Sequence, residues 1–308
     1  MKIDYIVPEK DNGREIVRIL NTEFLVSRQM VKKLKFNGEV LLNGVHATVR
    51  ERVKTGDKLH FELEDTCGTI RHLDNIPIYY EDEWFLIVDK PAGIVTHPTH
   101  GHLDDSLLTL LSDGTLHPVI RLDRETSGII LIAKNGYAHN TLHVFGNLKK
   151  QYLAVCYGSF GSVTGTIDQP IARRPGSVMI RDVDPEGKRS VTHFSEVFYD
   201  EEKNISLVRF ELETGRCHQI RVHSRYEGHP LVGDGLYGPN SIDNPSDLFP
   251  LSKELDAKIG RCALHAFKLE IDNPFNSNHE VFTSPLPSDM KELFSRPELI
   301  DEALGKIY

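Results

Sequence analysis

The spacing of apolar residues predicts two helices followed by a small sheet at the start of the chain. In "GREIVRIL" the apolar positions recur at helical spacing, and Ser27 is a favourable N-cap for the next helix, "RQMVKKLKF". Val31 and Leu34 lie on one side of that helix. A hairpin follows in "EVLLNGVHATV", because Asn43-Gly44 is a strong two-residue turn signal, and "TGDKLHFEL" supplies one more alternating strand. We therefore expect a compact unit over roughly the first 60 residues.

After a linker-like stretch, "GTIRHLDNIP" (residues 68–77), strand patterns outnumber helix patterns. The stretches with strand character are "WFLIVDKPAG", "GIILIAKN", "KQYLAVCYG", "SVTHFSEVFY", "ISLVRFELE" and "HQIRVH", and those with helix character are "DSLLTLLSD" and "GYAHNTLHVFGNL". Many of the strands follow one another like hairpins, which favours a mixed, largely antiparallel sheet over a parallel doubly wound fold. The prediction is an α+β protein with a small domain at residues 1–72 and a second domain at 73–308, whose helices pack on its sheet.

The composition is that of a folded protein without a segment suited to a membrane. Of the 308 residues, 39% are hydrophobic and 26% are charged, and the longest notable apolar run is "GIILIA". The N-terminus has no signal-peptide core. The four cysteines show no Cys-x-x-Cys spacing, which favours reduced thiols and a cytoplasmic location.

Charge is distributed unevenly, and this limits what the net charge of −9 can exclude. Residues 1–75 carry 13 Lys and Arg against 12 Asp and Glu, whereas residues 240–308 carry 7 against 12. In the second predicted helix Arg28, Lys32 and Lys35 recur at i, i+4 and i+7, which aligns them on one face. Such a basic stripe is either a solvated helix face or a surface that binds nucleic-acid phosphates.

The first unit resembles the αL RNA-binding motif, and the resemblance rests on "SRQMVKKLKFNGEVLLNG" and "VKTGDKL", within about residues 13–63. It implies that Arg28, Lys32 and Lys35 contact RNA.

A histidine cluster, "HPTHGHLDD", comes close to the ligand spacing of a hydrolase zinc site. Its members are His97, His100, His102, Asp104 and Asp105. The stretch ends in Asp where such a site would place another His, and no second group of ligands is convincing downstream. We therefore expect no metal here; bound zinc would be the mark of a metal-dependent hydrolase.

One carboxylate, Asp123, stands between Arg121 and Arg124 in "HPVIRLDRETSG", just before an apolar strand. A surface ion pair in a turn would explain this arrangement, and so would a catalytic carboxylate, since perturbed carboxylates gather at active sites as well as in structural ion pairs.

A second group of donors lies in "GRCHQIRVH". Taken as a strand, it places Ile220 and Val222 on one face and Arg221 on the other. Its cationic side chains, with Arg216 and His218 among them, suit the binding of phosphate or carboxylate groups.

Several motifs, taken in order, carry a resemblance to a known family. "DKPAGIVTHP", "HPVIRLDRETSGIILIAKN", "KQYLAV", "GRCHQIRVH", "GDGLYG" and "LHA" are similar in sequence and approximate spacing to RNA pseudouridine synthases of the RluA/RluD type. The resemblance covers roughly residues 75–285 and implies that Asp123 is the essential catalytic residue. It further implies that Arg221 is the electrostatic partner of Asp123 and that Tyr152 packs against the uracil. Arg121 would hold the flipped nucleotide or fill the gap it leaves.

Two positions depart from the family pattern. Ile120 stands where the family usually has His, and Gly235 stands where it usually has Pro. The first affects a local hydrogen bond and the second the stiffness of a loop, and neither carries the assigned chemistry.

The implied reaction converts uridine in RNA to pseudouridine, and it needs no cofactor because only a proton is exchanged overall. A carboxylate beside the sugar would act as nucleophile or base once the target base has left its stack. Large-subunit ribosomal RNA is the expected substrate, with transfer RNA as the alternative, and Arg216 and His218 are expected to contact it. A competing interpretation is a non-catalytic RNA-binding protein in which the second domain is a scaffold. No protein or membrane partner is implied, and a monomer is expected.

Overall fold

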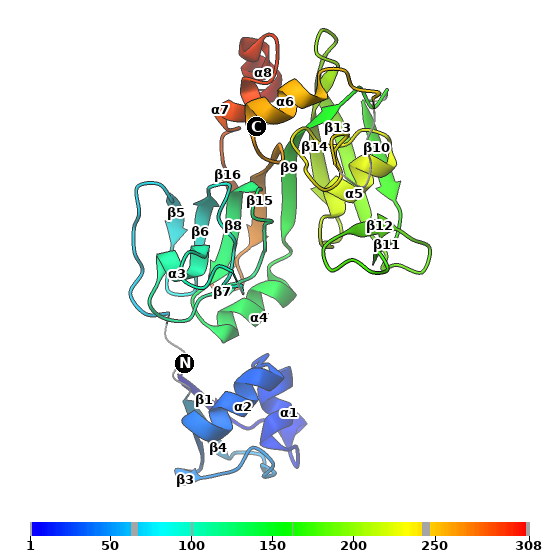
Figure 1. The fold of residues 1–308 in the computed structure, drawn as a ribbon. Coiled ribbons are helices and arrows are strands. Elements are labelled where there is room, and N and C mark those ends of the chain that lie inside the picture. Colours follow the sequence, from blue (N-terminus) through cyan, green and yellow to red (C-terminus); the bar gives the residue numbers. More distant parts are fainter. Residues whose placement is uncertain (1, 63–66, 100, 162, 242–246, 306–308) are drawn as a thin grey trace.

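The computed structural model describes residues 2–62, 67–99, 101–161, 163–241 and 247–305. Its first unit is a four-stranded antiparallel sheet in the order β1-β4-β2-β3, accompanied by two helices (Figure 1). These elements are β1 (Lys2–Ile6), η1 (Glu9–Asp11), α1 (Ile16–Thr22), α2 (Arg28–Asn37), β2 (Glu39–Leu42), β3 (Val45–His46) and β4 (Lys58–Glu62). The two helices, the hairpin and the last strand are as predicted, whereas β1 is a strand that the charged N-terminus did not indicate.

Local chemistry explains where these elements begin and turn. The hydroxyl of Ser27 accepts a hydrogen bond from the backbone N–H of Met30 at 3.2 Å, which caps α2 as predicted. Asn43 and Gly44 have φ values of 55° and 81°, so the β2–β3 hairpin turns through two left-handed residues, as the Asn-Gly signal requires.

The side chains of the predicted basic stripe, Arg28, Lys32 and Lys35, are all exposed on α2. On the same helix Val31 and Leu34 are buried in the core of the unit, as predicted. The stripe therefore faces solvent and is available to a charged partner.

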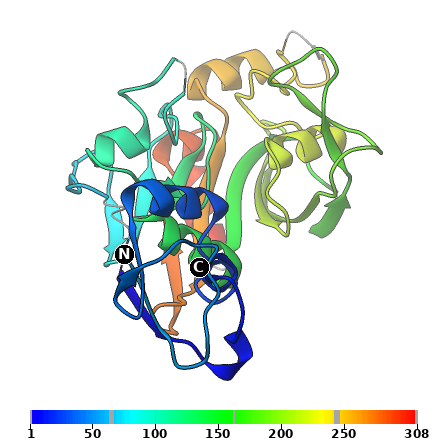
Figure 2. The same ribbon diagram turned by 90° about the horizontal axis from the view of Figure 1, so that it is seen from below.

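The first unit contacts the larger one through α4 (Gly136–Phe145). The side-chain amide of Asn140 donates a hydrogen bond to the carbonyl of Leu25, and Tyr137 packs against the apolar core of the first unit. Two perpendicular views place the first unit near α4 and the β5–β8 half of the large sheet, away from β10 and β13 (Figures 1 and 2).

The larger unit is built on one ten-stranded sheet, whose main path runs β10-β13-β14-β9-β15-β8-β6-β5, with β16 paired to β15 and β7 to β8. The strands are β5 (Ile78–Glu81), β6 (Phe85–Lys90), β7 (His117–Pro118), β8 (Ser127–Ala133), β9 (Lys149–Tyr157), β10 (Thr164–Asp168), β13 (Val191–Asp200), β14 (Ile205–Leu212), β15 (Leu264–Asp272) and β16 (His279–Thr283). A separate hairpin consists of β11 (Ile171–Arg173) and β12 (Arg181–Val183). Since β8 and β15 are parallel and the other pairs in this sheet are antiparallel, the predicted mixed, largely antiparallel sheet is confirmed.

Helices pack on both halves of this sheet. Besides α4 they are α3 (Leu107–Leu111), α5 (Gln219–Tyr226), α6 (Ser252–Ile259), α7 (Ser288–Lys291) and α8 (Pro297–Leu304). One apolar core joins α3 and α4 to β6 and β8, and a second joins α6 and α8 to β9 and β14. Within the described residues no helix has the length and apolar character needed to cross a membrane.

The strand predicted in "HQIRVH" is wrong, because these residues form most of α5. Every residue from Gln219 to Ser224 is buried, so Ile220 and Val222 do not mark one exposed and one buried face. The helix begins after His218, whose backbone is left-handed at φ 58°. The correction matters for the site, since it places Arg221 one helical turn after His218.

A close backbone contact joins β8 to β15 beside the Asp123 loop. Gly128 has φ +108°, and a Cβ placed there would lie 2.2 Å from the carbonyl oxygen of Ala266. Only glycine allows this approach, which brings the start of β8 against its parallel neighbour β15.

Candidate active site

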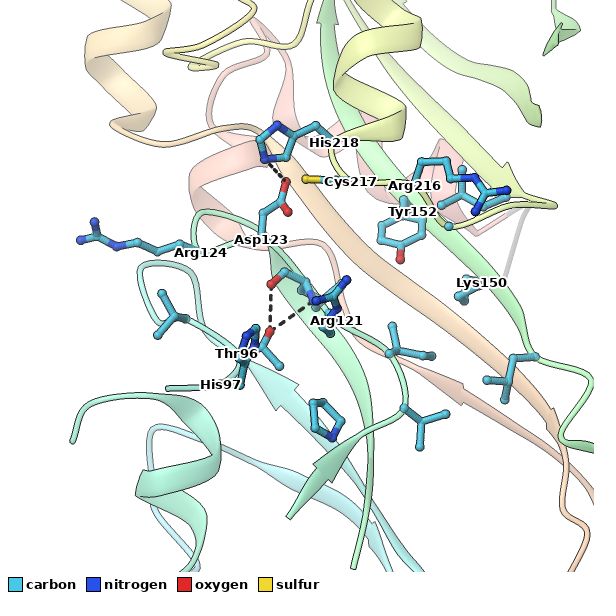
Figure 3. A pocket seen from close by; sticks show the side chains of 18 of the residues that line it. Thr96, His97, Arg121, Asp123, Arg124, Lys150, Tyr152, Arg216, Cys217 and His218 are labelled. Carbon is cyan, nitrogen blue, oxygen red and sulfur yellow. Dashed lines mark hydrogen bonds and ion pairs between the residues drawn. The ribbon is translucent and has the colours of Figure 1, made fainter. Parts of the chain in front are cut away.

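The segment that holds Asp123, the strand β9 and the loop before α5 enclose a pocket of about 790 Å³ (Figure 3). Among the described residues that line it, Asp123 is the one with an acidic side chain. The cationic and imidazole side chains in the lining are His97, Arg121, Arg124, His139, His143, Lys150, Arg216 and His218. Such a lining suits an anionic ligand, although the whole chain carries a net charge of −9.

The backbone on both sides of Asp123 is held from within. The hydroxyl of Thr96 donates to the carbonyl of Leu122 at 2.8 Å, and the N–H of Leu122 approaches the same hydroxyl at 3.3 Å. The N–H of Thr126 donates to the carbonyl of Asp123 at 3.1 Å, which closes a turn. Leu122 is buried, so the side chain of Asp123 is turned toward the pocket and is about one third exposed (33%).

The buried ammonium group of Lys90 holds the same segment through hydrogen bonds to backbone carbonyls. Lys90 has no exposed surface, and its Nζ donates to the carbonyls of Pro91 at 2.9 Å, Ile94 at 2.8 Å and Arg124 at 3.2 Å. Burial lowers the pKa of Lys90 to about 7, and the charge of Asp123 opposes this shift. Lys90 therefore ties the end of β6 to the residue that follows Asp123.

Arg221 joins two carboxylates. Its Nη1 donates to Oδ2 of Asp123 at 3.1 Å, which confirms the predicted contact between these two residues. Its two-point contact, however, is with Asp234: Nε donates to Oδ2 and Nη2 to Oδ1, both at 2.7 Å. Burial lowers the pKa of Arg221, but the hydrogen bonds and charge of Asp234 raise it more, so the guanidinium stays charged. Asp234 thus fixes the orientation in which Arg221 meets Asp123.

His218 supplies a second contact to the same carboxylate oxygen. Its Nε2 lies 3.7 Å from Oδ2 of Asp123, and its Nδ1 lies 2.8 Å from the hydroxyl of Tyr237. That hydroxyl also accepts the backbone N–H of Arg181 at 2.9 Å, so Tyr237 links the imidazole to the start of β12. Burial lowers the pKa of His218 more than the charge of Asp123 raises it, which favours the neutral ring.

Tyr152 lies on β9 with its side chain in the pocket lining (Figure 3). It is buried (7% exposed), and burial, with the nearby charge of Asp123, raises the pKa of its hydroxyl. The phenol therefore stays protonated and offers an apolar ring face within the pocket.

The sequence-predicted site residues fall into two groups. Arg121, Asp123, Tyr152, Arg216 and His218 all line the pocket, and Arg221 contacts Asp123 from behind it. The residues of the basic stripe lie on α2 in the first unit and not in the pocket lining.

The histidine cluster does not form a group of metal ligands among the residues that the structure describes. His97 lines the pocket, whereas His102 pairs with Asp105 at 2.8 Å, and His100 lies outside the described residues. Within those residues the group whose potential ligand atoms lie close together is Glu39, His60 and Glu62, on the sheet of the first unit.

Comparison with known proteins agrees with this site. A family model of RNA pseudouridylate synthases matches residues 84–226, and a model of the N-terminal domain of RluD ribosomal pseudouridine synthases matches residues 3–59. The uncharacterized RNA pseudouridine synthase YjbO of Bacillus subtilis is 37% identical over 287 residues, which covers 88% of this chain and 95% of the relative. The chain belongs to the RNA pseudouridine synthases.

Other relatives match nearly the whole length of this chain as well. Ribosomal large subunit pseudouridine synthase D of Buchnera aphidicola is 33% identical over 302 residues, covering 92% of this chain and 93% of that one. Among solved structures, human RNA pseudouridylate synthase domain containing 1 has a similar fold, with a TM-score of 0.57 at 23% identity, over 76% of this chain and 96% of the human one.

Three residues of this pseudouridine synthase site were missed as functional from the sequence. Asp234 and Tyr237 lie in "GDGLYG", and Lys90 lies in "DKPAG", so each stood in a quoted motif without a role. The signal in the sequence is that Asp234 and Tyr237 each adjoin a glycine and Lys90 adjoins a proline, residue types that mark turns and loops. Of the two departures from the family pattern, Ile120 is buried in the pocket lining, and Gly235 has open space around it.

Proposed function

We propose that this pseudouridine synthase isomerises uridines of large-subunit ribosomal RNA, with Asp123 as its catalytic carboxylate. Two relatives named ribosomal large subunit pseudouridine synthase D, from Buchnera aphidicola and Xanthomonas campestris, match 92% and 94% of this chain. The match of residues 3–59 to the N-terminal domain of the same kind of enzyme supports the same substrate class.

The observation that carries the role of Asp123 is the distribution of its contacts. Arg221 and His218 both approach Oδ2, whereas Oδ1 accepts no hydrogen bond from any residue that the structure describes. The hydrogen bond from Arg221 at 3.1 Å and the imidazole of His218 at 3.7 Å orient the carboxylate from one side. The other oxygen keeps its lone pairs for the substrate, so Oδ1 is the atom we assign to the reaction.

The chemistry requires one carboxylate in a closed pocket. The bond between C1′ of the ribose and N1 of the uracil breaks, the uracil turns, and a bond forms between C1′ and C5. The proton on C5 is lost and N1 gains one, so atoms balance without a cofactor. Oδ1 of Asp123 acts either as the nucleophile that holds the separated fragment or as the base that removes a proton.

The remaining pocket residues have positioning roles in this proposal. The ring of Tyr152 packs against the uracil. Arg121 is exposed at the pocket and makes no hydrogen bond or ion pair with the described part of the chain, so its guanidinium is free to hold the RNA from which the base is flipped. Flipping costs a few kcal/mol, and contacts of this kind offset it.

The decisive experiment maps pseudouridines in total RNA from cells with and without the gene. Loss of one or more pseudouridines from large-subunit ribosomal RNA, restored by the wild-type gene and not by one that encodes Asp123→Asn, is the expected result. Loss confined to transfer RNA would overturn the substrate assignment, and an unchanged map would overturn the enzymatic role.

A further inference from the structure

Lys150 is a cation in the active-site pocket to which neither the site nor the reaction assigns a role. It lies on β9 two residues before Tyr152, so both side chains project from the same face of the strand (Figure 3). Both residues belong to the pocket lining. At the rise of a β-strand their backbone positions are about 7 Å apart. This spacing lets the two side chains contact neighbouring groups of one nucleotide, such as a base and a phosphate.

The ammonium group of Lys150 has no protein partner among the residues that the structure describes: it makes no ion pair and donates no hydrogen bond to them. It is nevertheless half-buried, and burial lowers its pKa. A partly buried charge without a counter-charge destabilises a fold, so its presence indicates a ligand that supplies the missing anion.

The surroundings of Lys150 favour a phosphate as that anion. A Cβ placed on Gly215 would lie 3.7 Å from Nζ of Lys150, so the ammonium lies against the loop that carries Arg216 into the same pocket. On α4, His139 and His143 add two imidazoles to the lining, with their rings nearly parallel and 6.4 Å apart. The acidic member of the lining, Asp123, pairs with Arg221 and not with Lys150.

The neighbouring residue on β9, Lys149, has a different environment from Lys150. Lys149 projects from the opposite face of β9, is largely exposed, and lies 3.6 Å from Glu270 on β15. Lys149 and Glu270 therefore form a surface ion pair, which contributes little to the stability of the fold.

We propose that Lys150 binds the RNA phosphate next to the target uridine and so positions the sugar beside Asp123 while Tyr152 contacts the base. This inference rests on the proposed function, because it needs an RNA strand in the pocket. It adds a phosphate-binding residue to the site.

The test uses single-turnover isomerisation of a synthetic RNA copied from the sequence around a uridine that loses its modification in cells without the gene. In two further RNAs one phosphate, on the 5′ or the 3′ side of that uridine, is a neutral methylphosphonate. For the wild-type protein, one of these linkages should raise the half-saturating RNA concentration by roughly tenfold. Lys150→Met should raise it by a similar factor on normal RNA and show no further loss with that linkage, because both changes remove the same ion pair.

Two variants serve as controls. Lys149→Met should behave like the wild type on all three RNAs, and Lys150→Arg should keep the sensitivity to the neutral linkage because it keeps the charge. The inference would be overturned if the neutral linkage raised the half-saturating RNA concentration of Lys150→Met by a further factor. It would also be overturned if Lys150→Met bound normal RNA as tightly as the wild type. A fall in the maximal rate alone would likewise overturn it, since that would place the ammonium on the uracil. If the wild-type protein converts no uridine in any RNA, the proposed function fails instead.

Discussion

Asp123 has both of its contacts on Oδ2, a hydrogen bond from Arg221 and the nearby imidazole of His218, and it is the carboxylate that we propose to be catalytic. Asp123→Asn keeps the size of the side chain and an oxygen for Arg221, but it removes the charge. Isomerisation should fall at least about a hundredfold if the carboxylate is a base, and should vanish if it is a nucleophile. Release of labelled hydrogen from C5 of uridine in a single turnover measures this.

The fold and the RNA affinity of Asp123→Asn should match the wild type, because the side chain is a third exposed and hydrogen bonds from Thr96 and Lys90 hold the backbone of the residues on either side. Isomerisation at the wild-type rate by the folded variant would refute the catalytic assignment.

Asp234 is the structural anchor of the site, because it holds Arg221 by two hydrogen bonds and is fully buried. Asp234→Asn replaces a charged acceptor by an amide that faces a guanidinium with a donor. Breaking a buried pair in this way should lower the free energy of unfolding by about 3 kcal/mol, measured by denaturant titration near pH 7. A matched control is Asp182→Asn, whose two-point pair with Arg174 is nearer the surface and should contribute about 1 kcal/mol or less.

The stability difference between the wild type and Asp234→Asn should depend on pH. Burial raises the pKa of Asp234, but the hydrogen bonds and charge of Arg221 outweigh it, so the folded-state pKa lies below the ordinary 3.8. A depressed carboxyl pKa contributes stability above the unfolded value and loses it as pH falls through the folded value. The difference should therefore be constant near neutrality and shrink below about pH 4. A difference that grows in acid would contradict this account.

The strand β8 and the helix α5 differ in how far the sequence determined them. The apolar run "GIILIA" predicts a buried strand, and all seven residues of β8 are buried. In "HQIRVH" two alternating apolar residues resemble a strand pattern. In α5, however, Gln219, Arg221 and His223 are buried as well, and each meets a polar partner distant in the sequence. Short apolar runs do not distinguish a strand from a buried helix, and distant partners leave no local pattern.

In the candidate site, too, the sequence predicted some features and not others. Asp123, Tyr152 and Arg221 could be identified because each stands in a motif that resembles a family. Their arrangement could not, since Arg221 reaches Asp123 from a helix 98 positions away and takes its orientation from Asp234. Lys150 is beyond a sequence argument for a different reason: only the fold shows that Lys149 has a carboxylate partner, whereas Lys150 has none in the part of the chain that the structure describes.

The contact of β8 with β15 gives a test of how closely the Asp123 segment depends on the sheet. Gly128→Ala would force a Cβ against the carbonyl of Ala266 in a backbone conformation that favours glycine. The free energy of unfolding should fall by at least about 2 kcal/mol, and isomerisation should fall further than stability alone explains, because the turn that holds Asp123 leads directly into this strand. Gly235→Ala, which meets no atom within 4 Å, is the control and should change the stability by less than about 0.5 kcal/mol. Equal stability of the two variants would show that the sheet tolerates the displacement.

The whole molecule is acidic, yet the surfaces proposed to meet RNA are locally basic. The net charge is −9, whereas the described residues of the pocket lining include one carboxylate and several cations, and α2 exposes Arg28, Lys32 and Lys35. Local fields rather than the total decide such an encounter. The first unit contacts the larger one through α4, whose His139 and His143 line the pocket. An RNA held on α2 is therefore held by a unit adjoining the helix that borders the active site.

If the stripe on α2 binds phosphates, replacing Arg28, Lys32 and Lys35 by Gln should weaken RNA binding without unfolding the protein, because all three side chains are exposed. Each lost phosphate contact reduces the slope of log affinity against log salt by somewhat under one unit, so the triple variant should lose about two units. Lys54→Gln, an exposed lysine of the same unit outside α2, is the control for the change in net charge. At saturating RNA the isomerisation rate should persist, since Asp123 and Tyr152 lie in the other unit. An unchanged salt slope would show that the stripe is a solvated helix face and that the pocket side of the molecule supplies the RNA contacts.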